Sequence, residues 1–291
     1  MFKTILFPTD FSEYSLKTLE YVWGLKAAGV ERVILVNILE AVDEYPIALA
    51  RKRRTLEALK EQEEILSNHG LQTESRVELG KPYREILRIA EEEEVSMIVI
   101  GCHGKGLLDE VVIGSVSDRV TREATVPVML VKYKVLHKEG GDRLEKTSGE
   151  SFKKILYTTD GSPCAQMAKK FIRGFAQAGC KEVIIASVVD PNTVPQKDIP
   201  KAVKELETKL SVAAGELRER GLMSKVMVPV GTPLEELLRI AKEERVSLIV
   251  MGSTGKGYFK QMVLGSVSES MIREAKCPVL IIHNEVCEIP L

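Results

Sequence analysis

The sequence MIVIGCHGKGLLDEVVIGSVS, residues 97–117, contains the pattern that decides the fold. It starts with four apolar residues that suit a strand buried on both faces. Gly101 and Gly104 follow with two residues between them, and nine residues later Gly114 begins a Gly-Ser-Val-Ser stretch typical of a helix start. A strand, a glycine loop and a helix N-terminus in this order predict a place for an anion, because the free N–H groups of the first helical turn point at the loop.

The same pattern occurs a second time, as LIVMGSTGKGYFKQMVLGSVS at residues 248–268. The repeat extends well beyond the glycine loop, since FKTILFPTD at residues 2–10 matches FKKILYTTD at residues 152–160. A separation of about 150 residues is far longer than the roughly 20–50 residues of a solenoid unit. The sequence therefore indicates a whole domain written twice.

Each copy is predicted to alternate between strands and helices. Its strands are apolar on both faces, and serine or proline opens several of the helices between them. This pattern predicts the α/β class, with two tandem domains that each contain a five-stranded parallel sheet covered by helices on both faces. We expect the domains at residues 1–133 and 152–291. A glycine-containing segment of mixed charge at residues 134–151 suits a linker.

Composition and charge narrow the function classes. Apolar residues make up 44% of the chain, no apolar run reaches the roughly 20 residues of a membrane span, and the net charge is -1. Neither nucleic acid nor a membrane is therefore expected as a partner. The five cysteines show no C-x-x-C spacing, which argues against a disulfide framework or a zinc site. The start of the chain lacks the regions of a signal peptide, so we expect a cytoplasmic protein.

The first strand of each copy leads into an aspartate, Asp10 or Asp160. In an open parallel sheet, ligands bind at the carboxyl ends of the strands, where such a carboxylate can accept hydrogen bonds from a ribose hydroxyl or an exocyclic amine. A nucleotide fits this arrangement, with its sugar near the aspartate and its phosphates on the helix N-terminus. A tight turn and a simple helix cap would also explain one glycine loop, but two copies with the same spacing favour a nucleotide or other anion.

The two halves resemble domains of the universal stress protein family. The family's signature is a glycine, two residues, a glycine, nine residues, and then glycine with serine or threonine; both copies match it. The resemblance implies a five-stranded parallel α/β sandwich related to the adenine-nucleotide α-hydrolases, and it implies the ATP-binding branch of the family. The implied cofactor is ATP or AMP, with Mg²⁺ accompanying ATP.

The resemblance also implies which residues bind the nucleotide. In the first copy they are Pro8, Thr9, Asp10 and Val36 at the adenosine end, with Gly101, His103, Gly104, Gly114, Ser115, Val116 and Ser117 at the ribose and phosphates. In the second copy they are Thr158, Thr159, Asp160, Ala186, Gly252, Thr254, Gly255, Gly265, Ser266, Val267 and Ser268. Thr158 replaces a proline, Ala186 a valine and Thr254 a histidine, so we expect the first site to bind more tightly.

Three function classes remain open. The leading one is an adenine-nucleotide-binding protein of stress response or signalling, with one site for ATP, ADP or AMP in each domain. The enzymatic alternative is a slow ATPase or adenylate hydrolase on the same fold. Efficient hydrolysis requires a positioned base, and the carboxylate that we expect beside each loop is the aspartate after the first strand, Asp10 or Asp160. The third class is an interaction scaffold with empty loops.

Three smaller features carry their own expectations. His103 either contacts a phosphate or is an exposed loop histidine, and Cys102 is either redox-active or a small apolar residue below the loop. The run Glu91–Glu94 puts four acids at a helix end, where they oppose the helix dipole and predict fraying.

The resemblance implies pairing through the fifth strands, at residues 128–131 and 279–282. An apolar edge strand left uncovered invites pairing with another strand, so we expect the two domains of one chain to pair there. A homodimer of chains through other faces is a further expectation.

Overall fold

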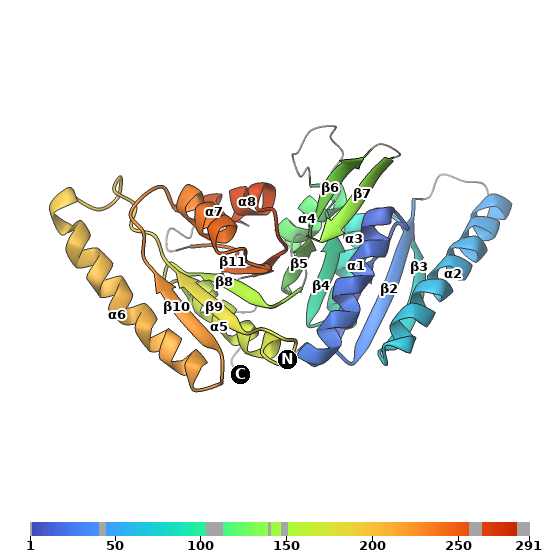
Figure 1. The fold of residues 1–291 in the computed structure, drawn as a ribbon. Helices are drawn as coiled ribbons and strands as arrows, with labels where there is room; N and C mark the ends of the chain where they lie inside the picture. Colours follow the sequence, from blue (N-terminus) through green and yellow to red (C-terminus); the bar gives the residue numbers. More distant parts are fainter. Residues whose placement is uncertain are drawn as a thin grey trace. The chain divides into compact units, whose positions relative to one another are not determined.

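The computed structural model describes residues 2–40, 45–102, 113–138, 141–146, 151–255 and 264–283. The chain divides into two compact units, Met1–Glu145 and Lys146–Leu291. Each unit is built on a five-stranded parallel sheet with helices on both faces (Figure 1). The predicted α/β class with two tandem domains of this kind is confirmed.

In the first unit, strands and helices alternate as predicted. The elements are β1 (Thr4–Pro8), α1 (Glu13–Gly24) with a 3-10 turn (Leu25–Ala28), β2 (Arg32–Leu39), α2 (Tyr45–Asn68), β3 (Gln72–Leu79), α3 (Pro82–Glu92), β4 (Met97–Gly101), α4 (Ser115–Glu123) and β5 (Val128–Val131). The sheet order is β3-β2-β1-β4-β5, and every neighbouring pair is parallel. The chain therefore reverses its direction of winding between β1 and β4, which creates a topological switch point.

The second unit repeats this arrangement. Its elements are β8 (Lys154–Thr158), α5 (Pro163–Phe175), β9 (Glu182–Ala186), α6 (Ile199–Arg218) after a 3-10 turn (Gln196–Asp198), β10 (Met223–Met227), α7 (Pro233–Glu243), β11 (Leu248–Gly252), α8 (Ser266–Glu274) and β12 (Val279–Ile282). The sheet order is β10-β9-β8-β11-β12, again all parallel. Its switch point lies between β8 and β11.

Local signals explain where the first helix of each unit starts. The Ser12 and Ser162 hydroxyls each accept a hydrogen bond from a backbone N–H three residues later, over 3.3 Å in both cases. The helical segments end before Gly29 and Gly179, whose φ angles of 97° and 92° lie in the left-handed region that suits glycine. A serine cap and a left-handed glycine therefore bound the first helical segment of both units.

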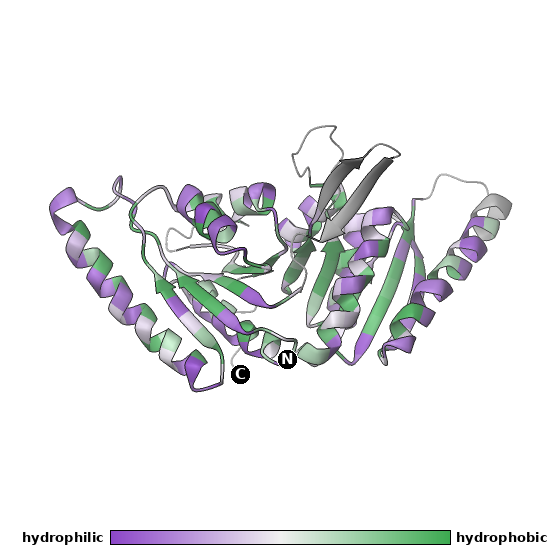
Figure 2. Ribbon diagram, viewed as in Figure 1, coloured by the Kyte–Doolittle hydropathy of each residue, from purple (hydrophilic) through white to green (hydrophobic). Residues whose placement is uncertain are grey.

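Apolar strands form the core of each unit. In Figure 2 the strands are largely green, whereas the outward faces of α2 and α6 are largely purple. Helices α1 and α2 cover one face of the first sheet and α3 and α4 the other; α5 and α6, and α7 and α8, do the same in the second unit. Burial on both faces explains why the inner strands and the fifth strands show apolar runs rather than alternation. The edge strands β3 and β10 are only partly buried and are more polar.

The segment expected to be a linker contains regular structure. Residues Tyr133–Lys138 form β6 and Gly141–Lys146 form β7, and the two strands pair in a separate two-stranded sheet. A Gly-Gly dipeptide between two short strand-forming runs is typical of a hairpin. The composition of the segment did not suggest this regular structure.

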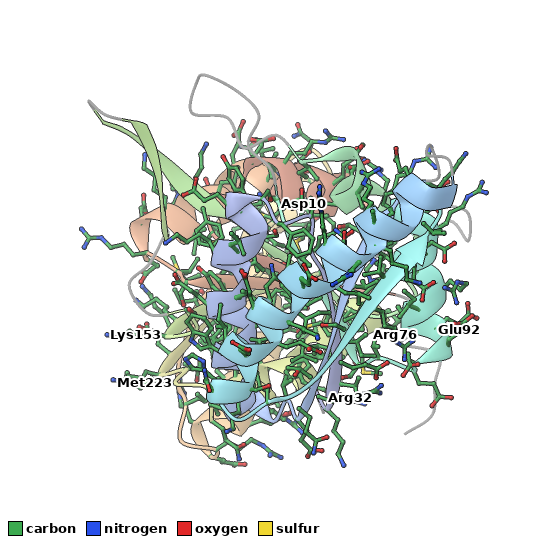
Figure 3. All side chains as sticks on the ribbon, turned by 90° about the vertical axis from the view of Figure 1, so that its right-hand side faces the viewer. Asp10, Arg32, Arg76, Glu92, Lys153 and Met223 are labelled. Atoms are coloured by element: carbon green, nitrogen blue, oxygen red, sulfur yellow. The ribbon has the colours of Figure 1, made fainter. Side chains whose placement is uncertain are left out.

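An ion-pair network lies at the amino-terminal ends of the strands in each unit. In the first unit, Arg32 and Arg76 both contact Glu74 and Glu93. Figure 3 shows Arg32 and Arg76 at the end of the sheet opposite Asp10.

The second unit has a corresponding network in which the side-chain charge is reversed at two positions. There, Lys154 contacts Glu182 at 2.8 Å and Glu244 at 3.3 Å, and Lys225 contacts Glu244 at 2.6 Å. Glu182 stands at the position of Arg32, and Lys225 at that of Glu74. The charges stabilise both sheets away from the switch points.

No helix in the described ranges is long and apolar enough to span a membrane.

Candidate functional site

A pocket opens at the carboxyl edge of the first sheet, at its switch point, with a volume of about 470 Å³. Nine of the predicted residues line it: Pro8, Thr9, Asp10, Val36, Gly101, Gly114, Ser115, Val116 and Ser117. They come from the ends of β1, β2 and β4 and from the start of α4. His103 and Gly104 lie outside the described residues.

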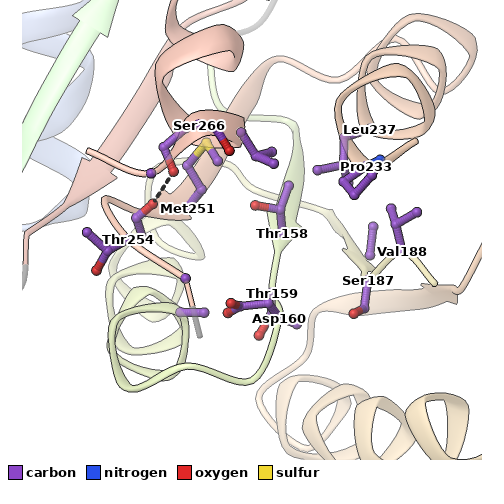
Figure 4. Close-up of a pocket in the computed structure, with 17 residues that line it drawn as sticks. Thr158, Thr159, Asp160, Ser187, Val188, Pro233, Leu237, Met251, Thr254 and Ser266 are labelled. Atoms are coloured by element: carbon purple, nitrogen blue, oxygen red, sulfur yellow. Dashed lines mark hydrogen bonds between the residues drawn. The ribbon is translucent and has the colours of Figure 1, made fainter. Parts of the chain in front are cut away.

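The second unit has a pocket of about 310 Å³ at the matching place. All eleven residues predicted for this copy line it: Thr158, Thr159, Asp160, Ala186, Gly252, Thr254, Gly255, Gly265, Ser266, Val267 and Ser268. Figure 4 shows Thr158, Thr159 and Asp160 at the end of β8, with Ser266 at the start of α8 across from them. The segments that the sequence pattern singled out therefore line one pocket in each unit.

Each aspartate is fixed by the serine that caps the following helix. The Asp10 carboxylate accepts a hydrogen bond from the Ser12 backbone N–H at 3.0 Å and another from the Ser12 hydroxyl at 2.6 Å. Asp160 accepts one from the Ser162 backbone N–H at 2.9 Å. These bonds hold a negative charge at the pocket wall that faces the helix N-terminus.

The residue before the first aspartate is held by a buried polar network. The Thr9 N–H donates to the carbonyl oxygen of Val36 at 2.9 Å, and the Asn37 amide donates to the Thr9 carbonyl oxygen at 2.7 Å. The Gln62 amide donates to the Thr9 hydroxyl oxygen at 3.2 Å, and the Gln62 side chain is only 1% exposed. The turn after β1 is therefore fixed before any ligand arrives.

The helix N-terminus in each pocket is capped by a glycine, Gly114 in α4 and Gly265 in α8. Because glycine has no side chain to accept from the first N–H groups, those groups remain available to an anion. The exposed Ser115 and Ser266 add a hydroxyl at the rim of each pocket. Both pockets therefore pair a positive helix end with an aspartate on the opposite wall.

The second serine of each Gly-Ser-Val-Ser stretch donates a hydrogen bond to the backbone at the end of the fourth strand. Ser117 donates its hydroxyl hydrogen to the carbonyl oxygen of Gly101 at 3.0 Å, and Ser268 donates to Gly252 at 2.9 Å. Both serines are buried. These bonds tie the start of the helix to the end of the fourth strand and so set the width of the pocket.

The glycines at the end of the fourth strands are required by helix packing as well as by the loop. A Cβ at Gly101 would lie 2.9 Å from the Thr18 hydroxyl, and one at Gly252 would lie 2.8 Å from the Cys164 Cβ. The first helix of each unit therefore approaches the end of the fourth strand closely at this glycine. Gly255 does border the pocket closely, since its Cβ would lie 2.6 Å from an Asp160 carboxylate oxygen.

Sequence reasoning missed one wall of each pocket. Pro82 and Ile86 from α3 line the first pocket, and Pro233 and Leu237 from α7 line the second. The signal was present: both copies repeat a proline at the start of the third helix and an apolar residue four positions later, on the same helix face. These side chains supply an apolar part of each pocket's lining.

Cys102 directly follows β4 and is 2% exposed. Its burial raises the pKa of the thiol to about 11, although the charge of Lys132 opposes this shift. A thiol with so high a pKa is largely protonated near neutral pH and is a poor nucleophile. Of the two readings of this residue, the packing role suits the structure.

Known proteins resemble the chain over nearly its whole length. The model of the universal stress protein family matches residues 1–132 and again 151–283. A universal stress protein of Methanocaldococcus jannaschii is 35% identical over 156 residues, which cover 46% of this chain and 96% of that protein. One from Mycobacterium tuberculosis is 27% identical over 227 residues, covering 75% of this chain and 72% of that protein.

The fold agrees with a solved structure of the same family. The crystal structure of a universal stress protein from Archaeoglobus fulgidus superimposes with a TM-score of 0.74 and 26% identity, covering 96% of this chain and 98% of that chain. The double match of the family model corresponds to the two compact units. The chain belongs to the universal stress protein family, as a tandem of two such domains.

Proposed function

We propose that the protein binds one adenine nucleotide in each of its two pockets and acts through that binding in stress response or signalling. The observation that supports this most directly is the pairing, in both units, of a glycine-capped helix N-terminus with an aspartate across a pocket. The two pocket volumes, about 470 and 310 Å³, lie in the roughly 300–1,000 Å³ range of small-molecule sites. The Gly-Ser signature of the ATP-binding branch adds to this support.

The chemistry of the walls orients the nucleotide. The phosphates would bind the free N–H groups at the starts of α4 and α8, because negative charge is most stable there. The ribose would donate to Asp10 or Asp160. The base would lie against the apolar surface of Val36 and Ile86 in the first unit.

Mg²⁺ fits this arrangement as a companion of ATP. Within the described ranges there is no cluster of three or more potential metal-ligating His, Cys, Asp or Glu side chains. Mg²⁺ commonly enters nucleotide sites on the phosphates with several of its waters retained, so a protein cage is not required.

Binding is favoured over hydrolysis as the main activity. The described lining of each pocket contains a single carboxylate, Asp10 or Asp160, and that group already accepts a hydrogen bond from the backbone N–H of the capping serine. A hydrolase would need a base positioned on the attacking water and groups that neutralise charge on the phosphates. Turnover of ATP at about 1 per second or faster, abolished by Ser115→Ala and Ser266→Ala, would instead make the protein an enzyme.

Equilibrium binding of ATP, ADP and AMP to the full chain tests the proposal. Calorimetry should find up to two sites, and GTP serves as the comparison ligand. Asp10→Asn and Asp160→Asn keep an acceptor oxygen for the capping serine but remove the charge, so each should weaken binding at its own site. Glu13→Gln, an exposed acid on α1 outside the pocket lining, is the matched control. The absence of binding by all three adenine nucleotides would refute the function.

We also propose that the fifth strands, β5 and β12, pair within one chain and that chains associate further through other faces. The support is the apolar character of both strands, which makes each an aggregation hazard if left uncovered. Separately produced halves should then self-associate or bind each other in light-scattering measurements. Halves that remain monomeric alone and when mixed would contradict the pairing. We propose separately that the protein is cytoplasmic.

A further inference from the structure

The second unit contains a cleft of about 820 Å³ between α5 and α6, distinct from the nucleotide pocket. Thr159, Asp160 and Ser187 border both spaces, so the cleft begins behind the end of β8 and runs outward between the two helices. Its outer half is lined by Lys169, Lys170, Arg173, Lys209 and Glu216. Four cations and one carboxylate therefore surround the outer half.

The inner end of the cleft exists because two buried amides of the first unit have no counterpart here. Aligned on Gly70 and Gly221, which both have positive φ, Gln62 corresponds to Ala213. Counting from the first strand, Asn37 corresponds to Ser187. Gln62 is 1% exposed and Asn37 8%, so both fill space in the first unit. Their small replacements line the cleft.

The outer half differs even more in chemistry. Leu19, which is 2% exposed, is replaced by Lys169. Trp23, whose ring stacks on His69 with centroids 4.3 Å apart, is replaced by Arg173. An apolar and aromatic helix interface in the first unit has thus become a cationic one in the second.

The charges in the cleft do not balance. Lys169 contacts Glu216 at 2.8 Å, and Arg173 contacts the same carboxylate at 3.5 Å. In the part of the chain that the structure describes, Lys170 and Lys209 form no ion pair, and the buried Nε of Arg173 has no hydrogen-bond acceptor. Two cations share the one carboxylate of the outer half and two more lie near it, which leaves an excess of positive charge and a buried donor that an external oxyanion would satisfy.

We propose that this cleft of the second unit binds a small phosphorylated molecule, with its phosphate among Lys169, Lys170, Arg173 and Lys209. A phosphate offers several acceptor oxygens and can bridge a guanidinium and ammonium groups at once. Asp160 lies at the inner end and repels negative charge, so the uncharged part of the ligand faces Thr159, Ser187 and Ala213. This site does not depend on nucleotide binding in the glycine-loop pockets.

The test uses the full chain at constant ionic strength near 0.15 M, with fructose 1,6-bisphosphate as the probe and citrate as a carboxylate of similar charge. Calorimetry measures both. The exposed-end variant Lys170→Gln/Lys209→Gln removes two charges and leaves the Lys169–Glu216 contact in place. We expect it to weaken bisphosphate binding about tenfold, as the loss of two partly screened charge contacts implies.

A second variant places the residues of the first unit in the cleft: Lys169→Leu, Arg173→Trp and Ala213→Gln. It should abolish binding, with circular dichroism used to show that it is folded. Ser266→Ala alters the neighbouring nucleotide pocket at a residue that does not line the cleft, so it should leave bisphosphate binding intact, which separates the two proposals. Equal affinity in the wild type and the Lys170→Gln/Lys209→Gln variant, citrate binding as tight as that of the bisphosphate, or no binding at millimolar probe would each overturn the inference.

Discussion

The Ser117 hydroxyl donates a hydrogen bond to the carbonyl oxygen of Gly101 over 3.0 Å, joining the start of α4 to the end of β4. Ser117→Ala would leave that buried carbonyl without this donor. We expect a loss of about 1–3 kcal/mol in the free energy of unfolding, measured with urea. Ser115→Ala, at the exposed position two residues earlier, should change stability by no more than about 0.5 kcal/mol. A larger loss from Ser115→Ala than from Ser117→Ala would contradict this assignment of roles.

Gly252→Ala should destabilise the second unit. The new Cβ would lie 2.8 Å from the Cys164 Cβ and 3.1 Å from the Ala165 nitrogen, and neither atom is the end of a flexible side chain. Overpacking of this kind costs about 1–3 kcal/mol. Gly215→Ala on α6 is the matched control, because a Cβ there meets nothing within 4 Å and alanine favours a helix. The midpoint temperature of thermal unfolding should fall for Gly252→Ala and should stay unchanged or rise for Gly215→Ala.

The two nucleotide sites should differ in affinity through one wall residue. Val36 and Ala186 occupy the same place in the two pockets, and the alanine offers two fewer methyl-sized groups to the base. At about 0.8 kcal/mol per buried group, partial contact makes the second site several-fold to tenfold weaker. In calorimetry, Val36→Ala should raise the dissociation constant of the first site and Ala186→Val should lower that of the second. With both substitutions, the second site should become the tighter one. Dissociation constants that stay unchanged when Val36 and Ala186 are exchanged would refute this explanation.

Acid should weaken the first unit through Glu93. Hydrogen bonds from Arg76, and less strongly from Arg32, lower the pKa of its carboxyl below the ordinary value of 4.5, although burial opposes the shift. A lowered folded-state pKa gives stability that is present above about pH 4.5 and is lost as the pH falls through the folded value.

Glu93→Gln should therefore cost roughly 0.5–1 kcal/mol at pH 7, because the group is partly exposed, and progressively less toward pH 3. Urea unfolding at several pH values measures the difference between variant and wild type. A difference that stays constant with pH would show that Glu93 contributes by packing rather than by charge.

Much of the fold was predictable because its signals are local. The fifth strands were expected at residues 128–131 and 279–282, and these are their observed bounds. The Gly-Ser stretches and the aspartates are each contiguous in sequence with a strand, so the rule for parallel sheets placed them at one edge. Ligand contact by these residues remains a prediction.

Other features depend on residues that are distant in sequence. The acids at Glu91–Glu94 predicted a fraying helix end, yet Glu93 pairs with Arg76 and Arg32, 17 and 61 residues away. The cleft between α5 and α6 depends on what is missing at Ser187 and Ala213, which becomes visible only when the packing of the first unit is known. The apolar periodicity of one helix carries no information about space that small side chains on a neighbouring element leave empty.

The inverted polarity of the ion networks bears on how two similar halves of one chain avoid exchanging parts. If β2 of the first half inserted into the second sheet during folding, Arg32 would take the place of Glu182 beside Lys154. Glu182 in the first sheet would in turn face Glu74 and Glu93. Both exchanges bring like charges together, so the swapped product is disfavoured although the apolar strands are nearly interchangeable. The inverted charges thus favour the pairing of each strand within the sheet of its own half.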